Sequence, residues 1–142
     1  MKKIKFILAL FFLISGLAVI GYFKAIPGAD GGGDNPKIEM SPATFDFGDI
    51  QYGQIVEYDF TVKNTGKSVL EIKRVATSCS CTTAKISQET ITPGETVNLR
   101  VRYDSGAMGL AHGKGRQERV IYIRSNDPVT PQTESMIFAN VK

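Results

Sequence analysis

The stretch "IVEYDFTVKN", residues 55–64, decides the fold class, because polar and apolar side chains alternate along its whole length. Its apolar side chains are those of Val56, Tyr58, Phe60 and Val62. Successive side chains of a β-strand point to opposite faces, so this period of two predicts a strand with one buried face. An amphipathic helix would need its apolar residues three or four positions apart.

Shorter segments of the same kind lie on both sides of this strand. We expect further strands at residues 37–40, 44–50, 69–86, 96–104, 119–125 and 135–141. Turn residues separate them, among them Asn64-Thr65-Gly66, which tolerate a left-handed conformation. About seven short strands at this spacing predict an all-β fold, an immunoglobulin-like β-sandwich. The chain has no Trp and both cysteines share one expected strand, so the core alone must hold the two sheets together.

Residues 1–23 have the composition of an export segment. Three lysines at positions 2, 3 and 5 precede the uncharged run 6–23, which as a helix would span about 27 Å and cross a bilayer. We therefore expect an N-terminal hydrophobic helix that directs the rest of the chain out of the cytoplasm. Small residues inside the run favour a cleaved signal peptide, whereas the terminal pair Tyr22-Phe23 favours a membrane anchor. An anchor places the protein at the periplasmic face of the inner membrane; cleavage places it in the periplasm or at the cell surface.

Residues 24–36 are rich in Gly, Pro and Asp and predict a flexible tether, which leaves residues 37–142 for the sandwich. The net charge of +3 comes from the N-terminus, since four of the 17 basic residues lie within residues 1–24. The remainder has 13 basic and 14 acidic residues, too balanced to form a basic face for nucleic acid. We expect no nucleic-acid partner, and membrane contact only through residues 6–23.

The pair Cys79 and Cys81 allows several interpretations. In a regular strand their Cβ atoms would lie about 6.5 Å apart, whereas a disulfide needs about 3.5–4.5 Å, so a bridge requires a bulge or turn at Ser80. The two cysteines could also be buried free thiols, or one could form a disulfide with another chain. The two sulfurs could also bind copper or zinc with His112 and Met108, because two cysteines alone do not complete a structural zinc site. A redox pair is disfavoured because the neighbouring Ser and Thr residues supply no positive charge.

The segment "SGAMGLAHGKGRQER", residues 105–119, is the second candidate site. Glycine-rich connections of this length are uncommon unless they are functional or disordered. The phosphate-loop motif is absent, because Gly follows Lys114 where that motif requires Ser or Thr. We expect a long hairpin loop, with His112, Lys114, Arg116 and Arg119 as its candidate partner-binding residues.

Catalysis has little support in the sequence. The chain has one His and lacks the G-x-S-x-G and H-E-x-x-H motifs, so no set of nucleophile, base and orienting residue is evident. We therefore expect neither enzymatic activity nor a cofactor.

Five short motifs follow one another in a characteristic order. They are "FDFGDIQYGQ" (45–54), "FTVKNTG" (60–66), "SCSCTT" (78–83), "TPGE" (92–95) and "IRSNDP" (123–128). This order resembles DUF1573, a family of exported bacterial proteins of unknown function, over nearly all of residues 38–142. Ser80 stands where that family usually has glycine between the cysteines.

The family is similar to the immunoglobulin-like domains of Hydin and the major sperm protein, which bind or scaffold. The resemblance thus implies a sandwich fold and carries over no activity. We expect a non-catalytic binding or scaffold module of the bacterial cell envelope that recognises a protein partner through strand edges and the 105–119 loop. The alternative is a soft-metal binding protein with Cys79, Cys81 and His112 as ligands.

Overall fold

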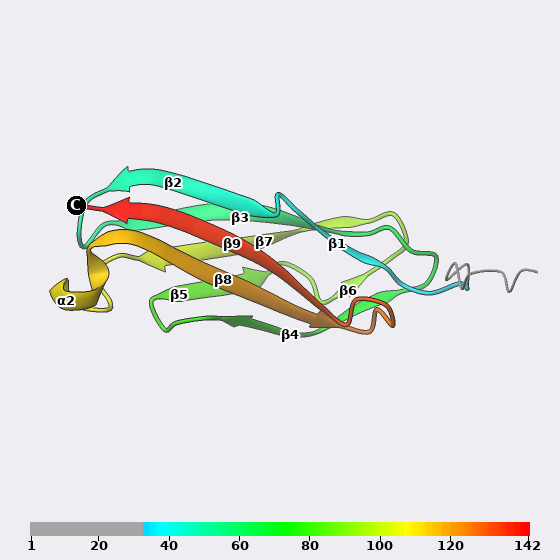
Figure 1. Cartoon of the computed structure of the whole chain (residues 1–142). Helices are drawn as coiled ribbons and strands as arrows, with labels where there is room; N and C mark the ends of the chain where they lie inside the picture. The colour runs from blue at the N-terminus through cyan, green and yellow to red at the C-terminus, as the bar shows by residue number, and fades with distance from the viewer. Residues whose placement is uncertain (1–32) are drawn as a thin grey trace, which may run out of the picture. The chain divides into compact units, whose positions relative to one another are not determined.

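The computed structural model describes residues 33–142, which form two β-sheets around one core (Figure 1). The expected helix within residues 1–23 and most of the expected tether lie outside the described residues. Within residues 33–142 no helix is long and apolar enough to cross a membrane. The described elements are β1 (Ile38–Ser41), β2 (Thr44–Ile50), β3 (Ile55–Asn64), β4 (Leu70–Thr77), β5 (Thr82–Ile86), β6 (Thr90–Ile91), β7 (Thr96–Asp104), α2 (Leu110–Gly113), β8 (Gly115–Ser125) and β9 (Gln132–Val141).

The strands are ordered β1-β3-β7-β5 in the first sheet and β2-β9-β8-β4-β6 in the second. The alternation seen in the sequence is confirmed in the central pair β3 and β7, where Phe60 lies opposite Leu99 and both are fully buried. Ile121 and Ile123 of β8 bring fully buried side chains to the same core from the second sheet. Burying each such side chain stabilises the fold by about 2 kcal/mol, so these inward faces hold the two sheets together.

The expected single strand 69–86 is wrong. The chain forms β4 in the second sheet, turns at residues 78–81, and enters the first sheet as β5. The alternation is already shifted within β4, where a bulge between Ile72 and Arg74 leaves both Lys73 and Arg74 exposed. The segment therefore connects the two sheets instead of spanning one of them.

The expected loop 105–119 is also too long. Strand β8 begins at Gly115, four residues before the expected strand 119–125, so Arg116 joins Arg119 in the strand and the connection shrinks to residues 105–114. A second difference concerns Gly66, which does not adopt the left-handed conformation expected for its turn. Glycine is required there for space, because a Cβ atom would overlap the carbonyl oxygen of Asn35.

The side chain of Asn64 ties together three segments at one end of the sandwich. Its Nδ2 donates to the carbonyl oxygens of Ser68 (2.8 Å) and Ile91 (2.9 Å). Its Oδ1 accepts from the main-chain N–H groups of Lys37 (3.3 Å) and Gly66 (3.0 Å). Asn64 is fully buried. Its bonds replace the hydrogen bonds to water that these main-chain groups lose on folding.

Asp127 plays a comparable role between the two sheets. Its Oδ2 accepts from the N–H of Ile38 in β1 (3.0 Å), while its Oδ1 accepts from those of Val129 (2.8 Å) and Thr130 (3.0 Å). Burial by itself would raise the pKa of Asp127. The hydrogen bonds from Thr130, Ile38 and Val129 outweigh burial and hold the pKa below its ordinary value.

We predict that Asn64→Ala lowers the free energy of unfolding by at least about 3 kcal/mol, because it leaves buried main-chain donors and acceptors without partners. Chemical denaturation measures the change. The matched control is Asn98→Ala on β7, whose side chain is exposed and should change stability by less than about 0.5 kcal/mol. Equal effects of the two substitutions would contradict the role given to Asn64.

A second prediction concerns pH. The folded-state pKa of Asp127 lies below the unfolded value of about 3.9, so its stabilisation is complete above that value and is lost as pH falls through the folded-state pKa. Asp127→Asn should destabilise the protein at neutral pH, because its Nδ2 cannot accept the Ile38 N–H. It should also reduce the fall in the free energy of unfolding at acid pH (the acid limb), measured by denaturation at several pH values. Asp59→Asn, which removes an exposed ion pair with Arg100 that solvent screens, should flatten that limb less than Asp127→Asn does.

Candidate functional site

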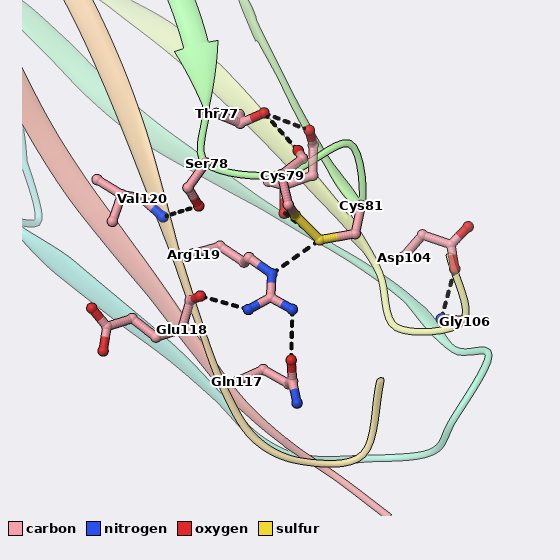
Figure 2. The surroundings of a disulfide bond; sticks show 11 residues. Thr77, Ser78, Cys79, Cys81, Asp104, Gly106, Gln117, Glu118, Arg119 and Val120 are labelled. Carbon is pink, nitrogen blue, oxygen red and sulfur yellow. Dashed lines mark hydrogen bonds between the residues drawn. A yellow bond between two sulfur atoms is a disulfide. The ribbon is translucent and has the colours of Figure 1, made fainter. Parts of the chain in front are cut away.

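The turn between β4 and β5 carries a disulfide between Cys79 and Cys81 (Figure 2). Their Cα atoms lie 5.3 Å apart, closer than in a regular strand, because the chain turns at Ser80. The Thr82 N–H donates to the Cys79 carbonyl (3.3 Å), and the Thr77 hydroxyl lies within hydrogen-bonding distance of the Cys79 and Thr82 carbonyls. The sequence left several interpretations of the two cysteines open, and the structure confirms one of them, a local disulfide with a turn at Ser80.

The neighbouring strand β8 holds this turn in place from one side. The Ser78 N–H donates to the Val120 carbonyl (2.9 Å), and the Val120 N–H donates to the Ser78 hydroxyl (3.0 Å). From the other side, the Asp104 N–H of β7 donates to the Cys81 carbonyl (2.9 Å). The disulfide is therefore fixed to both sheets at the point where the chain passes from one to the other.

Arg119 reaches from β8 to the disulfide, as Figure 2 shows. Its Nε donates to the Sγ of Cys81 at 3.0 Å. The two terminal nitrogens donate to the carbonyl of Glu118 and to Oε1 of Gln117, each at 2.6 Å. Four groups thus fix the guanidinium, because its carbon also lies 5.6 Å from the centre of the Tyr103 ring, within the range of a cation–π contact.

The two cysteines differ in how far solvent reaches them. Cys81 is only 3% exposed, whereas Cys79 is half-buried. Tyr103 lies opposite Thr82 in the ladder, and burial raises its pKa, although the positive charge of Arg119 opposes that rise. The Thr82 hydroxyl lies 3.6 Å and 3.7 Å from the two sulfurs. One positive charge therefore faces a sulfur that solvent scarcely reaches.

The predicted metal set of Cys79, Cys81 and His112 finds no support. The two sulfurs are bonded to each other, so neither is a thiolate that could bind a soft metal. Among residues 33–142, no three His, Cys, Asp or Glu side chains come together in a way that could hold a metal ion. His112 itself is exposed at the end of the molecule that carries α2.

The four predicted partner-binding residues come from two elements, the 105–114 connection and β8. His112 and Lys114 are exposed in the 105–114 connection. Arg116 pairs with Asp46 of β2 (2.9 Å) and lies over the ring of Phe138. Arg119 is held at the disulfide. The connection itself spans residues 105–114, and partner binding by the four residues stays a prediction.

That connection is anchored where it begins. The Ser105 hydroxyl lies 2.9 Å from the carbonyls of Gln51 and Gln54, and the Tyr52 hydroxyl donates to the Gly106 carbonyl (3.3 Å). Beyond these anchors, Met108 and Leu110 are 40% and 63% exposed. The loop therefore holds two apolar side chains at the surface beside the exposed His112.

Strand β5 forms an edge of the first sheet, since it pairs only with β7. The bond from Asp104 to Cys81 and the bond from Ser87 to Asn98 (2.8 Å) fix the phase of this antiparallel ladder. Hydrogen bonding alternates along such a ladder, so Ala84 and Ile86 direct their main-chain N–H and C=O groups away from β7, to the open edge.

An open hollow lies on the outer face of the sheet beside this edge. Its lining residues come from β3, β5, the residue after β5, and β7, and are mostly charged: Glu57, Asp59, Thr83, Lys85, Ile86, Ser87, Asn98, Arg100 and Arg102. Asp59 pairs with Arg100 (2.8 Å) and Glu57 with Arg102 (3.8 Å) across the strands. The edge and the hollow together offer main-chain groups and charged side chains on one side of β5.

Comparison with solved structures finds similar folds. A protein of unknown function from Porphyromonas gingivalis W83 is 27% identical with a TM-score of 0.67; the match covers 74% of this chain and 46% of that protein. PapD-like domain 7 of human CEP192 is 8% identical with a TM-score of 0.57, over 78% of this chain and 88% of that one. The periplasmic chaperone SfaE is 11% identical with a TM-score of 0.52, over 75% and 58%.

The likenesses to CEP192 and SfaE show the fold alone, a PapD-like or immunoglobulin-like sandwich. The chain spans less than half the length of the Porphyromonas protein. No curated protein matches the sequence. The profile of one sequence family, described as "Protein of unknown function (DUF1573)", matches residues 38–141, which include all five motifs noted above, and the chain therefore belongs to the DUF1573 family.

Proposed function

We propose that the protein is an exported, non-catalytic binding or scaffold module of the bacterial cell envelope. The observation that carries the proposal is the open edge of β5 with the charged hollow beside it. An extended segment of a partner can add to such an edge, where main-chain bonds supply affinity and side-chain pockets supply specificity.

Comparison of the four sheet edges favours β5 as the contact. Strand β6 has only two residues, and β1 has four between Pro36 and Pro42. Strand β2 has a bulge near Gly48 and carries Asp46 and Asp49, and bulges and charges of this kind protect an edge from pairing. Strand β5 has neither a bulge nor a proline, and its outward Thr83 and Lys85 are exposed.

Export to the cell envelope has two supports. The disulfide between Cys79 and Cys81 belongs to an oxidising compartment, because cytosolic thiols are kept reduced. The basic start and apolar run of residues 1–23 supply the means of export. The fold shared with SfaE, described as a periplasmic chaperone, is consistent with a binding role in that compartment.

A photo-crosslinking side chain placed in the full-length protein tests the edge in living cells. We predict that Thr83 and Lys85 positions capture an envelope protein, and that Ala84→Pro abolishes the capture. Proline removes only the outward N–H of Ala84 and is tolerated on edge strands, so stability should change by less than about 1 kcal/mol.

The matched control position is Lys63, exposed on the inner strand β3 of the same sheet, where no edge is available. Capture from Lys63 as strong as from Lys85, or capture that survives Ala84→Pro, would count against the β5 edge. Capture from Leu110 instead would assign the contact to the 105–114 connection.

A further inference from the structure

We propose that the Cys79–Cys81 disulfide is a thiol–disulfide exchange site that oxidises a dithiol, with Cys79 as the sulfur attacked and Cys81 as the leaving thiolate held by Arg119. This activity goes beyond the proposed binding role and does not depend on it. The substrate class is a reduced dithiol, either a small molecule or a pair of cysteines in an exported protein.

The first argument is the contact between Arg119 and Cys81. A guanidinium N–H at 3.0 Å from Sγ donates a hydrogen bond that strengthens when the sulfur becomes a thiolate. A positive charge beside a buried sulfur favours the thiolate form, and a better leaving thiolate speeds exchange. The bonds to Gln117 and Glu118 hold the guanidinium in place before any reaction.

The second argument is the unequal burial of the two sulfurs' residues. Cys79 is half-buried, whereas Cys81 is 3% exposed and faces the core. An incoming thiolate can therefore approach Cys79 more readily than Cys81. Attack at Cys79 is also the direction that leaves the new thiolate beside Arg119, so access and charge favour the same step.

The exchange proceeds in two displacements. A thiolate of the dithiol attacks Sγ of Cys79 and forms a mixed disulfide, while the Cys79–Cys81 bond breaks and its electron pair goes to Sγ of Cys81. The second thiolate of the dithiol then attacks the substrate sulfur of the mixed disulfide and releases Cys79 as a thiolate. The substrate loses two electrons and becomes a disulfide. The two cysteines gain those electrons and take from water the two protons that the dithiol released on ionising.

The test measures how fast dithiothreitol reduces the full-length protein, with the wild type compared to Arg119→Gln, Arg119→Lys and Arg124→Gln. We expect Arg119→Gln to be about three- to tenfold slower, because its leaving thiolate has lost the neighbouring charge. Arg119→Lys should recover part of the rate. Arg124→Gln, a matched change at an exposed arginine of the same strand, should stay within about twofold of the wild type.

Two further readouts separate this role from simple loss of structure. The pH at which the reduced wild type shows thiolate absorbance should lie below that of an ordinary cysteine, and Arg119→Gln should move it upward. With glutathione as a monothiol, quenching and mass spectrometry should find the mixed disulfide on Cys79. A rate for Arg119→Gln equal to the wild type, an unchanged thiolate titration, or a mixed disulfide on Cys81 would each overturn the proposal.

Discussion

A chain that passes repeatedly between two sheets must satisfy its main-chain polar groups at each crossing, and the structure depends on how it does so. Asn64 at the end of β3 binds four main-chain groups, Asp127 links the β8–β9 turn to β1, and Thr77 supports the turn between β4 and β5. Without these side chains, buried N–H and C=O groups would lose their hydrogen bonds to water and gain no others in exchange. The motifs "NTG" and "SNDP" thus mark places where the sandwich is tied together.

The sequence was sufficient for the fold class and for most strands, because period-two alternation is a direct consequence of strand geometry. It predicted the bounds of β2, β3 and β7 as the structure has them. It failed between residues 69 and 86, where the apolar positions change from even to odd at the Lys73–Arg74 bulge and back to even from Thr82 onward. That double change of parity signalled two interruptions, and a continuous strand could not have produced it.

The candidate site was harder to predict than the fold. The local sequence around Cys79 and Cys81 supplies no charge, and this argued against a redox pair. The charge comes from Arg119, 38 positions away along the chain from Cys81, and only the pairing of β4 with β8 brings it to the sulfur. The sequence placed Arg119 where the expected 105–119 loop meets the expected strand 119–125, so the direction of its side chain could not be predicted. Extension of β8 back to Gly115 fixes Arg119 in a ladder and so fixes its direction.

The position of the disulfide also links the two roles proposed for the domain. Cys81 ends the turn that begins β5, so the sulfurs lie at the start of the only long edge without a bulge or proline among the described strands. A partner strand that adds to β5 would pair with Ala84 and Ile86, because the outward N–H and C=O of Thr82 are already bonded to Cys79 and Thr77. The two proposals therefore concern neighbouring positions of one segment, the turn at residues 78–81 and the edge strand that follows it. Arg119 would serve both, because it holds the turn in place and stabilises the thiolate that the exchange releases.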